Sequence, residues 1–234
     1  MNQRALAAEL VGTFMLMAAV LGAFYAFGTP SLETPGGANL LGIALTVGFT
    51  AMALALAVGH VSGNVSGTVS GAHLNPAVTL GLIAGGRVAA GTAVGYIAAQ
   101  CAGAVAACGV YWLIGRAPPA FAANGYGALS PTQAGMLPVF VVETVLTAFL
   151  VFVAVGATNR RAPAGFAPIA LGATLAAIYV MAIPLSNASV NPARSLGSAL
   201  FAGRTALGQV WLFWVAPILG GVVGGALARW VQEE

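Results

Sequence analysis

Six long apolar stretches divide the chain, and short segments rich in Gly, Pro and polar residues separate them. The stretches run over residues 6–27, 39–59, 91–114, 135–157, 166–184 and 208–230. A helix needs about 20 consecutive apolar residues to cross a bilayer, so each stretch predicts one membrane-spanning helix. The first is too long for a removed signal peptide and lacks a small-residue cleavage pattern, so we count it as a span.

Two further apolar stretches, 76–84 and 192–201, are too short to cross a bilayer alone. Each begins with the Pro of an Asn-Pro pair, and Asn before Pro is typical of a helix start because Asn caps the helix and Pro fits its first turn. The sequence therefore predicts two half-helices. The Gly, Ser and Asn residues before them favour irregular backbone, which at membrane depth must line a cavity or be buried in protein.

The segments before these half-helices are copies of one another. Aligned on Asn-Pro-Ala, residues 70–78 and 186–194 share Ser and Ala at the same offsets, and the copies lie 191 − 75 = 116 residues apart. Three spans per half give the second copy the opposite orientation, so the two Asn-Pro-Ala segments should meet near the midplane. We expect one membrane domain over 1–234, with repeat one at about 1–115, repeat two at about 135–234, and a loop at 116–134.

The composition identifies the setting of these elements. The chain is 59% hydrophobic and 6% charged, with a mean hydropathy of +0.94. These values are typical of a helical integral membrane protein and not of a nucleic-acid-binding one. Five arginines flank spans on one side and only two on the other, which predicts cytoplasmic N- and C-termini by the positive-inside rule. The five are Arg4, Arg87, Arg160, Arg161 and Arg229, and the two are Arg116 and Arg204.

The paired motifs predict a passage for small solutes. Asn75 and Asn191 can each offer side-chain N–H groups to a solute while the oxygen holds the loop. The two half-helix N-termini put positive dipole ends at one point, which repels cations and favours neutral solutes. Arg194, directly after the second motif, is costly in a membrane unless it faces water, so we expect it to line the passage.

Glu9 and Glu143 are the only acids within the spans, and each stands four residues before a Thr. Two interpretations remain open. An intramembrane carboxylate pair could carry protons in a secondary transporter. We favour the other interpretation, in which each carboxylate accepts hydrogen bonds from the backbone of a re-entrant loop, with His73 as a further structural support.

Nothing in the sequence indicates catalysis. The chain contains no Asp, and no His, Cys and Glu residues cluster at the spacing of metal ligands or of a nucleophile triad. Cys101 and Cys108 are seven residues apart within one predicted span, so they lie on one helix face as small apolar residues. We therefore expect no enzyme activity, no metal site and no cofactor.

Several segments resemble signatures of the aquaporin family, in its bacterial water-channel type, over essentially the full length of the chain. The two motifs are Asn75-Pro76-Ala77 and Asn191-Pro192-Ala193, the second followed by Arg194. Other matching segments are Gly59-His60-Val61-Ser62-Gly63, Asn124-Gly125-Tyr126-Gly127 and Ala164-Gly165-Phe166-Ala167-Pro168.

The resemblance implies a homotetramer in the inner (plasma) membrane, with a pore in each subunit. Water would pass in single file, and protons and ions would be excluded at the Asn75 and Asn191 region and at the arginine. Positions that separate water channels from glycerol channels also match the water type: Ser195, Ala199, Phe213 and Trp214.

The same resemblance assigns a selectivity filter that departs from the bacterial type. Arg194 is in place, but Ala188, Tyr179 and Val47 stand where Thr or Cys, His, and Phe are expected, with Phe49 as the alternative to Val47. We expect a more apolar constriction of altered width. Ammonia, hydrogen peroxide, urea or glycerol could then pass together with water.

A tandem Val-Ser-Gly-x repeat at 61–72 is the second departure, because the family usually has one such unit. One interpretation is a duplication that is tolerated as a longer loop, since loop lengthening costs little closure entropy. The other is a flap over the cytoplasmic mouth that lowers permeability.

Overall fold

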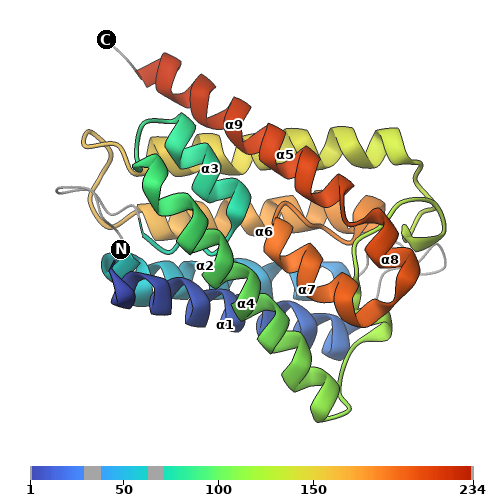
Figure 1. Cartoon of the computed structure of the whole chain (residues 1–234). Helices are drawn as coiled ribbons and strands as arrows, with labels where there is room; N and C mark the ends of the chain where they lie inside the picture. The colour runs from blue at the N-terminus through green and yellow to red at the C-terminus, as the bar shows by residue number, and fades with distance from the viewer. Residues whose placement is uncertain (1, 29–37, 63–70, 233–234) are drawn as a thin grey trace.

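The computed structural model describes residues 2–28, 38–62 and 71–232, and this part of the chain is helical with no strand. This part contains six helices that are long and apolar enough to cross a membrane, which confirms the predicted fold class of six transmembrane helices. They are α1 (Gln3–Phe27), α2 (Ala38–Ser62), α4 (Ala93–Leu113), α5 (Met136–Ala157), α6 (Ala167–Ser186) and α9 (Leu212–Gln232). Figure 1 shows them as a bundle around the shorter helices.

Two short helices begin at the Asn-Pro motifs, α3 (Pro76–Ala84) and α7 (Pro192–Ala202), and correspond to the half-helices predicted from the sequence. The last predicted span differs in detail. A separate short helix, α8 (Arg204–Gln209), precedes a turn, and α9 starts only at Leu212. Three 3-10 turns complete the described chain: η1 (Ala90–Thr92), η2 (Pro119–Ala122) and η3 (Gly127–Leu129).

The two halves pack through matching helix pairs. In the first half α1 packs on α4, and in the second half α5 packs on α9. The short helices cross between the halves, because α3 packs mainly against α9 and α7 packs mainly against α4. This is the arrangement of inverted repeats of three spans each, in which each half-helix is covered by the last span of the other half.

Small residues allow these helices to approach closely. A Cβ on Gly48 would come within 2.6 Å of the carbonyl oxygen of Gly172, where α2 crosses α6. At the crossing of α3 with α9, a Cβ on Gly225 would collide with the carbonyl oxygen of Gly81. Helices in a bilayer gain little from hydrophobic burial, so close backbone contact at small residues is a main source of their association.

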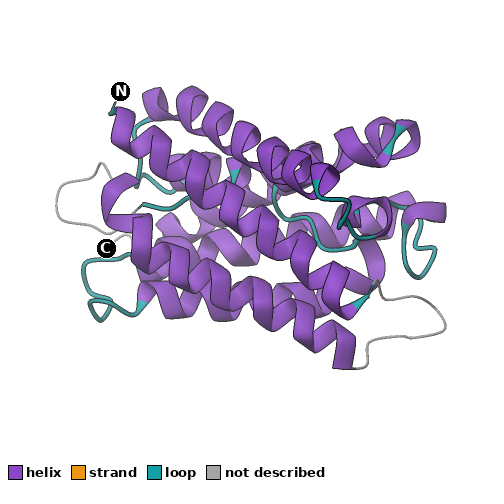
Figure 2. Ribbon diagram, turned by 90° about the horizontal axis from the view of Figure 1, so that it is seen from below, coloured by secondary structure: helices purple, strands orange, loops and turns teal. Residues whose placement is uncertain are grey.

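The outer surface is apolar, as expected for a multi-pass membrane protein. On α5, Val141, Val145 and Phe149 recur every four residues and are about half exposed. Both ends of the described chain lie at the same end of the bundle (Figure 2). The tandem Val-Ser-Gly-x repeat, and with it the proposed flap, falls largely on residues 63–70, which are outside the described part of the chain.

Candidate functional site

Each half-helix starts at an Asn cap. The Oδ1 of Asn75 accepts a hydrogen bond from the backbone N–H of Ala77 at 2.8 Å. The Oδ1 of Asn191 accepts from the backbone N–H groups of Ala193 at 3.0 Å and Arg194 at 3.3 Å. The next residue in each motif is Pro, which has no N–H to satisfy at the first helical position. The caps fix the direction of both Asn side chains.

The two Asn side chains also join the halves of the molecule. Asn75 Nδ2 donates to the carbonyl oxygen of Val190 at 2.7 Å, and Asn191 Nδ2 donates to the carbonyl oxygen of Leu74 at 2.9 Å. An amide nitrogen carries two hydrogens, so each side chain keeps a second N–H for another acceptor. The N-termini of α3 and α7 therefore meet with two amide groups between them.

The backbone just before each cap is strained. Leu74 has φ = 52° and Val190 has φ = 44°, a left-handed conformation that is unusual for a bulky residue and an outlier for a β-branched one. Such conformations cost of order 1–3 kcal/mol and persist only where the surroundings hold them. They turn the Leu74 and Val190 carbonyls toward the Asn amides.

A buried carboxylate holds each of these loops. The carboxylate of Glu9 accepts the backbone N–H groups of His73 (2.9 Å) and Leu74 (2.7 Å). The carboxylate of Glu143 accepts those of Ser189 (2.9 Å) and Val190 (2.7 Å). Both carboxylates are completely buried, so the hydrogen bonds offset the cost of placing a carboxylate in the protein interior.

Side chains complete the two carboxylate sites. Gln100 Nε2 donates to Glu9 at 2.7 Å, and Ser186 Oγ donates to Glu143 at 2.6 Å. The Nδ1 of His73 lies 3.0 Å from the hydroxyl of Thr79, and its ring packs edge-on against Tyr96. His73 thus contacts α3 and α4 as well as Glu9.

A narrow cavity passes between the two Asn caps. Its lining extends from Thr158 and Ala167, at the ends of α5 and α6, to Tyr179, about three turns further along α6, and Arg194. Apolar side chains from the long helices line much of it, and the Asn caps and the loops before them supply the polar groups. It offers about 90 Å³ to the centres of water-sized molecules. A single water needs about 10–15 Å³ on that measure, so the cavity has room for only a short file of waters.

Arg194 and Tyr179 line the cavity and are 2% and 3% exposed. The guanidinium of Arg194 donates to the Oδ1 of Asn124 and, at 2.9 Å, to the carbonyl oxygen of Asn187. Its Nε has no acceptor within the described chain. The phenol of Tyr179 interacts with the same guanidinium.

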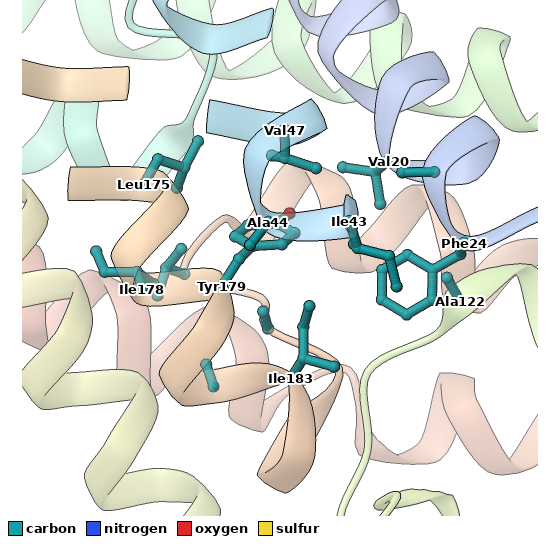
Figure 3. Packing of buried hydrophobic residues seen from close by; sticks show 14 of the residues in the cluster. Val20, Phe24, Ile43, Ala44, Val47, Ala122, Leu175, Ile178, Tyr179 and Ile183 are labelled. Carbon is teal, nitrogen blue, oxygen red and sulfur yellow. The ribbon is translucent and has the colours of Figure 1, made fainter. Parts of the chain in front are cut away.

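The other two predicted filter residues do not line the cavity. Val47 and Ala188 are completely buried and belong to the apolar cluster around Tyr179. Figure 3 shows the Tyr179 ring, which comes from α6, directed toward Ala44 and Val47 of α2. The alternative to Val47, Phe49, is 59% exposed at the surface and is not among the residues that line the cavity.

The sequence interpretation missed two polar residues of this region. Asn124 accepts from Arg194 and Ser195, and its Nδ2 donates to the carbonyl oxygen of Ser186 at 2.9 Å. Gln100 bridges Glu9 and Thr79. Gln100 could have been found as the one amide side chain in an otherwise apolar span. Asn124 stands in a loop, and only the family signature marks it.

Comparison with known proteins agrees with this geometry. The chain matches the family model described as Major intrinsic protein over residues 1–228. It is 46% identical to proteins named Aquaporin Z from Bradyrhizobium diazoefficiens and from Rhodopseudomonas palustris, in each case over 241 aligned residues that cover 100% of this chain and 95% of the relative. Its fold is similar to the X-ray structure of the aquaglyceroporin from Plasmodium falciparum, with a TM-score of 0.72 at 23% identity over 97% of this chain and 93% of that one.

Proposed function

The chain belongs to the major intrinsic protein family, and from this premise we infer that it is a passive channel that conducts water through the cavity between Asn75 and Asn191. The observation that carries this function is the reciprocal pair of hydrogen bonds from these two amides to the Val190 and Leu74 carbonyls. The pair places two half-helix N-termini and two spare N–H donors at one point of the cavity.

A water molecule between the two caps would meet the hydrogen-bond donors of both Asn side chains. Its oxygen would accept the second N–H of each Asn amide, so its own hydrogens would point away along the file. A water held in this way cannot relay a proton through the site. The positive ends of the α3 and α7 dipoles add an electrostatic barrier to cations.

Arg194 and Tyr179 would form the narrowest part of the passage. The unpartnered Nε–H of Arg194 is a donor for a passing water, and the guanidinium charge repels cations. Because Tyr179 lies against Arg194 and is almost fully buried, its ring occupies the space through which a larger solute would have to pass. We expect water to be preferred over glycerol and urea, with Tyr179 as the residue that sets this preference.

The alternative, a proton-coupled transporter that uses Glu9 and Glu143, finds no support in the structure. Neither carboxylate lines the cavity, and both are buried and occupied by N–H and O–H donors from the loops and neighbouring helices. A passive channel needs no such proton carriers. The function of this family is transport and not catalysis. We assign both carboxylates the role of holding the re-entrant loops.

The assembly and orientation are also part of the proposal. We propose one channel domain made of repeats 1–115 and 135–234, joined by the loop 116–134, and a homotetramer with a pore in each subunit. Half-exposed apolar faces such as Val141, Val145 and Phe149 could pack against lipid or another subunit. The similarity to bacterial relatives supports the inner membrane, and the arginine distribution supports cytoplasmic termini. Cross-linking in native membranes and labelling of single cysteines added at the termini would test these points.

Stopped-flow light scattering on proteoliposomes tests the function. We expect osmotic water flux well above that of protein-free liposomes, proportional to the osmotic gradient and unchanged by a proton gradient. Glycerol and urea uptake, measured in the same preparation, should stay near the protein-free level. Saturable water flux, or flux that follows an imposed proton gradient, would contradict a passive channel.

A further inference from the structure

A second pocket lies away from the water passage, where the C-terminal ends of α3, α5 and α9 meet. It is lined by Gly85, Gly86, Arg87, Asn159, Arg229 and Gln232. Its lining consists of two guanidinium groups, two amides and two glycines, so we call it the basic pocket. Figure 1 shows the C-terminal end of α9 beside α3 on the side of the bundle that also holds the N-terminus.

Arg87 is built into this pocket by neighbouring elements. Its Nη2 donates to the carbonyl oxygen of Val155 at 3.2 Å and to the Oε1 of Gln232 at 3.0 Å. The same Oε1 accepts from Asn159 Nδ2 at 2.8 Å. The guanidinium is therefore fixed in direction. Its Nε is buried and has no hydrogen-bond partner in the described chain, which is costly for a charged donor.

Arg229 brings a second positive charge to the same place. A Cβ built on Gly86 would lie 3.7 Å from the Nη1 of Arg229, so the glycine leaves open the space beside this guanidinium. Gly86 has φ = 70°, a turn conformation in which a larger residue would be strained. The pocket has about 370 Å³ for water-sized molecules, enough for a tetrahedral oxyanion and its hydration.

The surroundings of the basic pocket favour a lipid over a soluble anion. Val215 and Val222 stand fourteen and seven residues before Arg229 on α9, so they lie on the same helix face, and they are 49% and 40% exposed. They form an apolar stripe that leads to Arg229, and the next residue, Trp230, is 74% exposed. An exposed Trp next to an Arg at the end of a spanning helix is typical of the bilayer interface. Acyl chains would lie along the stripe and the headgroup would reach the guanidiniums.

We propose that the basic pocket binds the phosphate of an anionic phospholipid, with Arg87 and Arg229 as the phosphate ligands. Guanidinium groups suit this task because their planar N–H pairs match phosphate oxygens and keep their charge at the membrane surface. A bound headgroup would supply the acceptor that Arg87 Nε lacks. It would also join the ends of α3, α5 and α9 on the side of the membrane that holds the termini.

Native mass spectrometry of the detergent-purified protein, titrated with dioleoylphosphatidylglycerol or dioleoylphosphatidylcholine, tests the proposal. We expect tighter binding of phosphatidylglycerol than of phosphatidylcholine. One arginine near a lipid surface contributes about a fivefold change in affinity, so Arg229→Gln and Arg87→Gln should each weaken phosphatidylglycerol binding by about this factor. Phosphatidylcholine binding should not change.

Arg4→Gln is the matched control, because Arg4 is exposed, belongs to the same predicted cytoplasmic group and lies outside the pocket. Equal loss in this variant would mean diffuse surface charge and would overturn the proposal, as would unchanged binding in Arg229→Gln. Arg87→Gln removes two hydrogen bonds between elements and could unfold the protein. If Arg87→Gln is unstable, the result for Arg229→Gln alone decides the test. A melting temperature raised by inorganic phosphate in the wild type but not in Arg229→Gln, without any preference for phosphatidylglycerol, would assign the pocket to a soluble anion and overturn the lipid assignment.

Discussion

The side-chain nitrogen of Asn75 lies 2.7 Å from the carbonyl oxygen of Val190, so a residue of the first half of the chain satisfies the strained loop of the second. Asn191 and Leu74 make the converse bond. The two halves are therefore coupled at the centre of the passage. A change at either Asn should affect both the cap of its own half-helix and the opposite loop.

Replacing Asn75 by Ala should destabilise the protein by about 2–4 kcal/mol, because it removes an N-cap and leaves the buried Val190 carbonyl without its donor. Water permeability should fall in the same variant. Asn2 offers a matched control, since it also caps a helix, with Oδ1 accepting from the Arg4 N–H, but at an exposed site. Asn2→Ala should lower the free energy of unfolding less than Asn75→Ala does, and equal losses would contradict the coupling.

Replacing Glu143 by Gln should destabilise the loop before α7. The Gln side chain has only one acceptor oxygen, so either Ser189 or Val190 would face an N–H donor in place of an acceptor. Loss of a buried charge-assisted hydrogen bond costs about 1.5–3 kcal/mol, which unfolding in detergent can detect. Ser198→Ala is the control, because its buried hydroxyl has no partner in the described chain and its loss should be nearly neutral. A neutral Glu143→Gln variant would argue against the loop-holding role.

Replacing Tyr179 by Ala should raise glycerol permeability, because the ring that narrows the passage beside Arg194 is removed. Tyr179→Phe keeps the ring, so it should change glycerol exclusion little. Ile178→Ala is the matched control, as Ile178 is fully buried on the same helix but does not line the cavity. Glycerol and water uptake in proteoliposomes distinguish the variants, and a glycerol-tight Tyr179→Ala protein would remove Tyr179 from the filter.

Replacing Asn124 by Ala should loosen Arg194, because the Asn oxygen accepts from both Arg194 and Ser195. We expect lower water permeability and a measurable leak of small cations. Both Asn124→Ala and Asn124→Asp lose the hydrogen bond from Asn124 Nδ2 to the Ser186 carbonyl oxygen. Only Asn124→Asp retains an acceptor for the guanidinium. It should therefore stay closer to the wild type in both flux assays. Equal behaviour of the Ala and Asp variants would show that the acceptor is not what matters.

Replacing Gly225 by Ala should separate α3 from α9, because the new Cβ would collide with the backbone of Gly81. Overpacking at a close contact costs about 1–3 kcal/mol or more where backbone must move. Gly208→Ala, at a helical position with nothing within 4 Å, should be neutral or slightly stabilising. Thermal unfolding of both variants gives the comparison.

The sequence predicted the long and short helices because their signals are local. Apolar length defined the spans, and Asn-Pro placed the starts of α3 and α7 at Pro76 and Pro192. The start of the last helix was harder to predict. The predicted span begins at residue 208, yet Gly208 and Gln209 end α8, the chain turns at Val210 and Trp211, and α9 begins at Leu212.

The site was predictable where a motif, a charge within an apolar span or the family resemblance marks a residue. Motif and charge pointed to Asn75, Asn191 and Arg194. Whether Val47 lines the passage depends instead on the orientation of the Tyr179 ring. That ring and Val47 belong to one apolar cluster, and no local sequence pattern contains such tertiary packing. The partners Asn124 and Gln100 lie 70 and 91 residues from the groups they bind. Their roles follow from the fold.

The crossing of α3 with α9 has a consequence for synthesis. Gly81 leaves the ribosome 225 − 81 = 144 residues before Gly225, the residue against which it finally packs. Until the last span enters the bilayer, the first re-entrant segment has no helix to cover that face, and a nine-residue helix is too short to remain in lipid by itself. The nascent first half must therefore wait at the membrane surface or in the translocation machinery, and the conducting passage is assembled only when the chain is complete.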